Sequence, residues 1–266
     1  MAVYEDASAG PGGRVWDASV ALAQYLAANV DAASEIGGRS IVEIGAGAGA
    51  PGMVAALMGG VVTLTDRPRV GPLMWRNAML CNQAIAWGCS AVGTNADAAG
   101  SSGLSTDSAA SRGNSSCQQG GARVAIFEWG GAIKRISQQC PHPPAVLPCS
   151  LVIASDVVGC GDQSLFPSLV KTFRDLTRHS NGTLNASGPP KPDSTNTSSG
   201  SASSHPSPRI IMSYKYRSDF ESEFFEQMSA FFDRTELSTI SVKHAYISDL
   251  HVCMCNVCVL RRLKEL

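Results

Sequence analysis

The sequence predicts an α/β fold built on a doubly wound parallel sheet that ends in an antiparallel strand pair. Short runs of β-branched and apolar residues alternate along the chain with longer segments of helical periodicity. Continuous apolar runs of this kind are typical of parallel strands that helices cover on both faces. The last two strand-like runs have no helix between them, which indicates antiparallel pairing at the end of the sheet.

Each element follows from its local pattern. Apolar residues recur at helical spacing from Val20 to Leu26, so a helix is expected after Trp16. Met74, Ala78 and Cys81 lie on one side of another expected helix. The expected helices after the first cover residues 53–58, 73–85, about 163–178 and 219–233. The expected strands cover residues 40–44, 61–65, 123–127, 150–155, 210–214, 237–243 and 251–260.

Two segments depart from this alternation. Residues 95–121 and 179–208 consist almost entirely of Ser, Gly, Ala, Asn, Thr and Pro, which cannot bury enough apolar surface to offset their ordering entropy. We expect both segments to be disordered surface inserts. With 266 residues, of which 44% are hydrophobic, we expect one domain, residues 1–266, to hold the remaining elements.

The charge balance gives no indication of a nucleic-acid or membrane partner. Lys and Arg total 21 against 22 acidic residues, so no net field attracts nucleic acid or an anionic membrane. No apolar stretch reaches the ~20 residues that span a bilayer, and the first twenty residues do not resemble a signal peptide. We expect a monomer located in the cytoplasm, with the nucleus as the alternative compartment.

The nine cysteines are scattered and odd in number, which suits a reducing compartment better than a disulfide framework. Cys253, Cys255 and Cys258 form a C-x-C-x2-C cluster that could be interpreted as part of a zinc site, with His251 beside it. Because the cluster lies within a β-rich run and cysteine is commonly buried, we favour buried strand cysteines and expect no metal site.

The stretch "IVEIGAGAGAPG", residues 41–52, has glycines where a strand passes into a helix. Glycines there let the backbone take positive φ and approach a ligand closely. Gly47, Gly49 and Gly52 match G-x-G-x-x-G, which in a dinucleotide fold holds a pyrophosphate. A purely structural turn is the other interpretation.

Two acidic residues distinguish the possible ligands. Glu43 precedes the first glycine, and a carboxylate there would repel a pyrophosphate but attract the ammonium and sulfonium of S-adenosylmethionine. Asp66 ends the next strand, where its carboxylate could accept both ribose hydroxyls of any adenosine cofactor. The sequence therefore predicts S-adenosylmethionine as the cofactor.

Five motifs along the chain carry a more specific resemblance. They are "VWDAS", "IVEIGAGAGAPGMVAALMGGVVTLTDRP", "FEWG", "LVIASDVV" and "SYKYRSDFESEFF". In this order they resemble the motifs of methyltransferase family 16, in particular its methyltransferase-like 21 group of protein-lysine methyltransferases. The resemblance implies a class I fold, a Rossmann-like methyltransferase sheet of seven strands with an antiparallel last strand.

The resemblance also implies roles for individual residues. Trp16 would contact the cofactor, Asp66 would bind its ribose, and Trp129 would lie beside its adenine. The methionine moiety would lie over the turn formed by Gly45, Ala46 and Gly47. Ser155 would border the adenosine at the end of the fourth strand.

Asp156 is the predicted catalytic residue. It follows a strand at the edge where this architecture places its chemistry, and the family has an Asp-x-x-Tyr element at this point. Gly159 stands where the tyrosine would be. A helix-capping role ahead of residues 163–178 is the alternative for Asp156.

The expected activity is S-adenosylmethionine-dependent methylation of a lysine side chain of a protein substrate. A small-molecule methyltransferase and an inactive, cofactor-binding interaction protein are the alternatives.

Overall fold

Seven strands form one mixed sheet in the order β3-β2-β1-β4-β5-β7-β6. The first five pair in parallel, whereas β7 is antiparallel to both β5 and β6. This arrangement confirms the predicted α/β sheet with an antiparallel last strand. The strands are β1 (Ser40–Ile44), β2 (Val61–Asp66), β3 (Gly121–Ile126), β4 (Leu151–Ser155), β5 (Arg209–Tyr214), β6 (Phe232–Lys243) and β7 (Val252–Arg262).

The computed structural model describes residues 2–94, 120–140, 147, 149–160, 162–178, 208–217, 219–243 and 252–263. Most of the two predicted inserts, residues 95–119 and 179–207, lies outside this described part. Strand β3 begins at Gly121, which pairs with Val61, so the first predicted insert extends too far by that residue.

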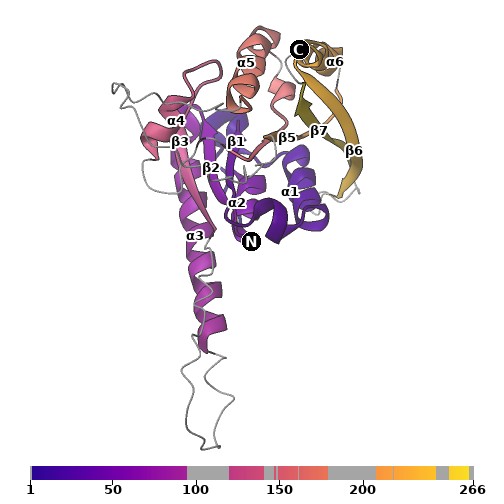
Figure 1. Cartoon of the computed structure of the whole chain (residues 1–266). Coiled ribbons are helices and arrows are strands. Elements are labelled where there is room, and N and C mark those ends of the chain that lie inside the picture. The colour runs from indigo at the N-terminus through magenta and orange to yellow at the C-terminus, as the bar shows by residue number, and fades with distance from the viewer. Residues whose placement is uncertain are drawn as a thin grey trace, which may run out of the picture.

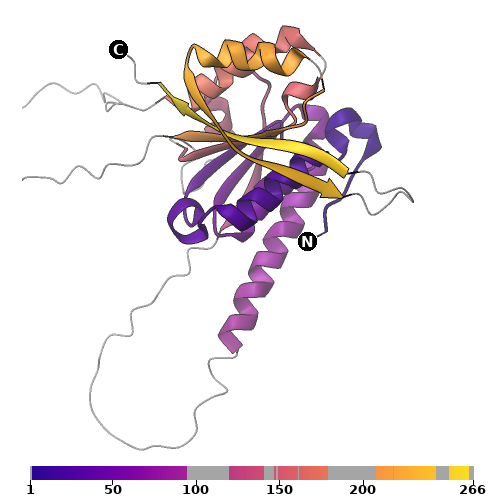
Figure 2. The same cartoon turned by 90° about the vertical axis from the view of Figure 1, so that its right-hand side faces the viewer.

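Helices cover both faces of the sheet (Figures 1 and 2). One face carries α1 (Asp17–Asn29), α2 (Ala50–Leu57) and α3 (Gly71–Thr94), and the other carries α4 (Lys134–Gln139), α5 (Phe166–Leu176) and α6 (Asp219–Ser229). Helix α3 continues well beyond the sheet (Figure 1). The short helices are η1 (Ala7–Gly13), η2 (Ala32–Ile36), η3 (Pro68–Val70), η4 (Val158–Cys160) and η5 (Gln163–Leu165).

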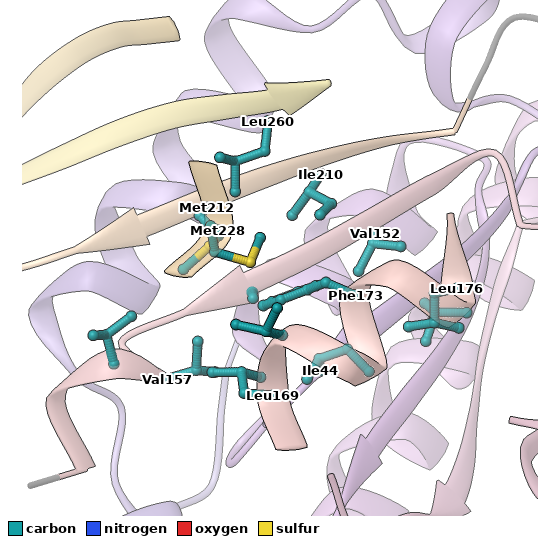
Figure 3. Close-up of a cluster of buried hydrophobic side chains, with 14 of the residues drawn as sticks. Ile44, Val152, Val157, Leu169, Phe173, Leu176, Ile210, Met212, Met228 and Leu260 are labelled. Atoms are coloured by element: carbon teal, nitrogen blue, oxygen red, sulfur yellow. The ribbon is translucent and has the colours of Figure 1, made fainter. Parts of the chain in front are cut away.

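Each face of the sheet has its own apolar core, because successive strand residues point to opposite faces. Ile41 of β1 packs with α1, α2 and α3, whereas Val42 and Ile44 pack with the opposite layer. Figure 3 shows this second core, in which Phe173 and Leu169 of α5 lie against the strands. The double-sided burial explains the continuous apolar runs in the strand sequences.

Several elements besides β3 differ from the sequence prediction, among them α3, which runs to Thr94 instead of ending at residue 85. Helix α4 was not expected, α6 ends at Ser229, and β6 begins at Phe232 instead of residue 237. The early part of β6 includes Asp233, Arg234 and Glu236, which obscure its strand pattern. Charged residues of this kind are common on edge strands, where they oppose pairing with other chains.

Cys255 and Cys258 are fully buried on β7. Cys255 packs against Ala18 and Ala21 of α1, whereas Cys258 belongs to the core beneath α5 and α6. The two thiols therefore lie on opposite faces of the sheet. Within the described residues, no group of three or more metal-binding side chains comes together.

Phe224 is expected to be a principal support of the α5–α6 layer. Its ring centroid lies 5.5 Å from that of Phe166 and 6.4 Å from that of Phe173, and its side chain is fully buried. We expect Phe224→Ala to lower the free energy of unfolding by about 3–5 kcal/mol, measured by urea denaturation. Trp87→Ala is the control because Trp87 is 82% exposed. Equal losses in the two variants would contradict the assigned packing.

Candidate functional site

The glycine turn joins β1 to α2 at the carboxyl edge of the sheet. Gly45 and Gly47 have φ angles of +62° and +54°. A Cβ atom on Gly45 would lie 2.8 Å from Val157 Cγ1, and one on Gly47 would lie 3.0 Å from the carbonyl oxygen of Gly12. Backbone conformation and close packing therefore both require glycine at these two positions.

Asp66 connects the end of β2 to this turn. Its Oδ2 accepts a hydrogen bond from the backbone N–H of Gly47 at 2.8 Å, and its Oδ1 accepts one from the N–H of Arg67 at 2.7 Å. Burial raises the pKa of Asp66, and these two backbone hydrogen bonds oppose that rise. Because a carboxylate has about four acceptor positions, Asp66 retains capacity for ligand hydroxyls.

Glu43 lies beneath the first turn of α2 and is fully buried. Its Oε2 accepts a hydrogen bond from the backbone N–H of Gly52 at 2.9 Å, and its Oε1 has no partner among the described residues. Loss of hydration raises the pKa of Glu43 to about 8, and the nearby charge of Asp66 adds to the rise. Glu43 is therefore mainly protonated at neutral pH. The sequence argument that a Glu43 carboxylate attracts the ammonium and sulfonium of S-adenosylmethionine depended on a negative charge that this state lacks.

Trp129 lies beside the glycine turn. Its Cζ2 would be 3.4 Å from a Cβ on Gly45. The backbone N–H of Gly130 donates to Thr172 Oγ1 of α5 at 2.8 Å, which holds this loop against the helix. Ser155 ends β4 and is 8% exposed. The structure thus brings Trp129 close to the turn, while the ligand contacts expected for Trp129 and Ser155 stay predictions.

Trp16 precedes α1 and is 41% exposed. Its indole Nε1 donates to the carbonyl oxygen of Pro11 at 2.9 Å. It lines an open recess of about 620 Å³ together with Glu5, Ala7, Arg14, Val15 and Asp17. The predicted cofactor contact of Trp16 is untested.

The segment before Trp16 also belongs to this region, which the sequence analysis missed. Gly12 packs against both Gly47 and Val70, and its own Cβ position is 3.8 Å from Asp66 Oδ2. Arg69 donates two hydrogen bonds, of 2.9 and 2.6 Å, to the carbonyl oxygen of Ser8. The "GPGG" of residues 10–13 was the available signal, since close backbone packing requires glycine.

Asp156 follows β4 and forms a bidentate ion pair with Arg217, with N–O distances of 2.7 and 2.6 Å. The helix-capping alternative for Asp156 is wrong. Helix α5 begins after Leu165 without a side-chain cap, and the carboxylate of Asp156 is bound by Arg217. Arg217 was a further residue that sequence reasoning missed.

The sheet order, with β7 antiparallel between β5 and β6, defines a Rossmann-like fold of the class I methyltransferase type. Residues 1–91 match the family model described as lysine methyltransferase, methyltransferase family 16. The match covers the first third of the chain. The matched segment contains Trp16, the glycine turn and Asp66, and it ends before Trp129 and Asp156.

Curated relatives match over a shorter segment. The protein N-lysine methyltransferase METTL21A of Mus musculus is 55% identical over 53 residues, which is 20% of this chain and 23% of the relative. The EEF1A lysine methyltransferase 3 of Mus musculus is 47% identical over 60 residues, which is 22% of this chain and 24% of the relative. The alignments thus span about a quarter of the length of these relatives.

Solved structures with similar folds include a putative RNA methyltransferase from Pyrococcus horikoshii. It is 11% identical, with a TM-score of 0.45 over 93% of this chain and 84% of that one. Magnesium protoporphyrin IX methyltransferase from Synechocystis, with S-adenosylmethionine bound, is 10% identical, with a TM-score of 0.42 over 91% of this chain and 77% of that one.

The burial of Glu43 predicts a pH-dependent stability. An unfolded glutamate loses its proton near pH ~4.3, whereas burial raises the pKa of Glu43 to about 8 in the folded chain. The folded state therefore keeps a proton that the unfolded state has lost, and stability falls as pH rises across this window. Glu43→Gln retains an acceptor for Gly52 and removes the titration. Its stability advantage over the wild type should grow by about 1–3 kcal/mol between pH 5 and pH 8.

Thermal and urea unfolding at pH 5, 6, 7 and 8 measures this difference. Glu226→Gln on the exposed side of α6 is the matched control and should not change the pH profile. A difference between Glu43→Gln and the wild type that stays constant from pH 5 to pH 8 would contradict a buried, protonated Glu43.

Proposed function

We propose that this chain is an S-adenosylmethionine-dependent methyltransferase that modifies a lysine side chain of a protein. The observation that carries the proposal is the hydrogen bond from Gly47 to Asp66, which sets a carboxylate beside a glycine turn. The match of residues 1–91 to the lysine methyltransferase family model supports the reaction class. Names of the relatives METTL21A and EEF1A lysine methyltransferase 3 support a protein substrate.

The residues of the site fit the proposed cofactor. The backbone at Gly45 and Gly47 presents no side chain toward its surroundings, and Asp66 keeps acceptor positions for ribose hydroxyls. Trp129 offers a flat apolar wall next to Gly45, which suits an adenine ring. Ala46 and Ser155 would border the same ligand. Because Glu43 is buried under α2, we assign it to shaping the turn from beneath.

The bound cofactor would supply an electrophilic methyl group, which the lysine nitrogen takes with its lone pair as the carbon–sulfur bond breaks and sulfur retains the bonding electrons. The chain must hold the amine in line with that methyl group and exclude water. Lysine has an ordinary pKa of about 10.4, so the amine must also lose its proton. We assign Asp156 to binding and orienting the amine and to accepting the proton that it releases. Asp156 is adjacent in sequence to Val157, which packs against the glycine turn at Gly45.

We further propose that the protein acts as a monomer in the cytoplasm. Five cysteines, at positions 81, 140, 149, 255 and 258, are buried free thiols, as expected in a reducing compartment. Among the described residues, no helix combines the length and apolarity needed to cross a membrane. Light scattering of the purified chain measures its oligomeric state.

The cofactor proposal predicts that calorimetry will detect binding of S-adenosylmethionine and no comparable binding of NAD. Asp66→Ala should weaken binding by about 1.5–3 kcal/mol, since hydrogen bonds to a charged group are lost. Asp233→Ala on β6, far along the sheet from β2, is the matched control. Preference for NAD, or an unchanged affinity in Asp66→Ala, would refute the assigned cofactor site.

The lysine proposal predicts that labelled S-adenosylmethionine will transfer its methyl group to protein lysines when the chain is incubated with a cell extract. Asp156→Asn should keep cofactor affinity nearly unchanged and reduce transfer by about 100-fold or more, the scale of a positioned acid–base group. Label found on small metabolites would support a small-molecule methyltransferase instead. Cofactor binding without transfer would support an inactive interaction protein.

A further inference from the structure

Arg217 covers the carboxylate of Asp156 at the end of β4. Its Nη1 donates to Oδ1 at 2.7 Å and its Nη2 donates to Oδ2 at 2.6 Å. The side chain of Asp156 is 8% exposed, whereas that of Arg217 is 33% exposed. The guanidinium therefore lies on the outer side of a nearly buried carboxylate. A parallel pair of charge-assisted hydrogen bonds of this kind holds both groups in a defined orientation.

Gly159 provides the space that the guanidinium occupies. A Cβ atom at residue 159 would overlap Nη1 of Arg217 and would lie 3.2 Å from Oδ1 of Asp156. The φ of Gly159 is outside the left-handed region, so its backbone conformation is open to other residues. The absence of a side chain, and not backbone freedom, is what position 159 contributes to the pair.

The backbone of Asp156 is held in an uncommon conformation. Its φ is +56°, a positive value that no other non-glycine residue of the described part shows. Its N–H donates to the carbonyl oxygen of Ser213 at 2.9 Å, which fixes the residue against β5. Such conformations persist where the surroundings fix them, and they cluster at active sites. The carboxylate is thus aimed by its backbone as well as by Arg217.

Arg217 has a second set of contacts that keep it near this position. Its backbone N–H donates to Glu221 Oε1 at 3.2 Å, and its Nη1 also contacts the carbonyl oxygen of Lys215 at 3.3 Å. The hydrogen bonds to Asp156 raise the pKa of Arg217 and keep it charged. With its side chain one-third exposed, the guanidinium can leave Asp156 while its backbone anchor remains.

The ion pair lies next to the proposed cofactor site. Val157 follows Asp156 directly, and its Cγ1 would be 2.8 Å from a Cβ on Gly45. A lysine ammonium has the same charge as the guanidinium and would bind the same carboxylate. Because the guanidinium covers the outer side of this nearly buried carboxylate, an ammonium that approaches from solvent must displace it.

On the basis of the proposed function, we propose that Arg217 occupies the amine-binding position at Asp156 in the free protein. The ammonium group of the substrate lysine binds Asp156 by displacing the Arg217 guanidinium. This exchange selects for cationic amines. A substrate group that is neutral or anionic when it binds cannot replace the guanidinium as the partner of Asp156. Displacing Arg217 would then leave a nearly buried carboxylate unpaired, which is unfavourable. The pair therefore contributes to the choice of substrate as well as to its orientation.

The experiment uses n-butylammonium chloride, which reproduces the end of a lysine side chain. In Arg217→Ala no guanidinium competes for the Asp156 carboxylate. The concentration of butylammonium that raises the Tm by a given amount should therefore be about tenfold lower than in the wild type. Sodium chloride at equal ionic strength and 1-butanol control for screening and for apolar binding. The double variant Asp156→Asn/Arg217→Ala should lose this gain, since it removes the carboxylate that binds the amine.

Gly159→Ala provides an independent variant, because it keeps the guanidinium but overlaps the position of Nη1, so the guanidinium must shift. It should also increase the sensitivity of the Tm to butylammonium. The proposal is overturned if both single variants respond as the wild type does, or if the double variant responds as strongly as Arg217→Ala. Calorimetry with S-adenosylmethionine on the same proteins separates the methyltransferase proposal from the proposal that an amine displaces Arg217. If the proteins bind butylammonium as expected but do not bind S-adenosylmethionine, only the methyltransferase proposal is refuted.

Discussion

The hydrogen bond that Gly47 donates to Asp66 joins the carboxyl ends of β1 and β2, and the rest of the candidate site is arranged around it. The two strands pair in parallel, so their carboxyl ends lie at the same edge of the sheet. Here the backbone at residue 47 turns back to reach a carboxylate of the neighbouring strand. The left-handed φ of Gly45 and Gly47 makes this path accessible, and the packing of Gly12 and Val157 leaves no room for side chains along it.

A consequence of this geometry is that two carboxyl groups lie close to one short turn. Asp66 is stabilised as an acceptor by two backbone N–H groups, whereas Glu43 has one such partner and is fully buried. Their mutual repulsion is avoided when one of them keeps its proton, and burial favours Glu43 for that role. The turn therefore combines a neutral acid beneath the backbone with an acceptor beside it.

The sequence predicted the sheet well because its strands are buried on both faces and so have continuous apolar runs. It predicted β6 poorly, since the charged residues at positions 233, 234 and 236 interrupt the strand pattern. Asp66 could be placed from its position after a strand. The pairing of Asp156 with Arg217 could not, because it joins residues 61 positions apart through loops whose paths depend on tertiary packing. For the same reason, the approach of Gly12 to the turn was not visible in the pattern.

The position of β7 between β5 and β6 has a consequence for the order in which the sheet assembles. Strand β6 precedes β7 in the chain, and within the described part of the chain it pairs in the sheet with β7 alone. During synthesis, β5 and β6 both emerge with an unpaired edge, and neither edge is satisfied until β7 enters between them. Open edges are templates for pairing with other chains, and long-range pairing is slow to form. The nascent protein can therefore associate wrongly with other chains at this side of the sheet until β7 is synthesised and pairs with both β5 and β6.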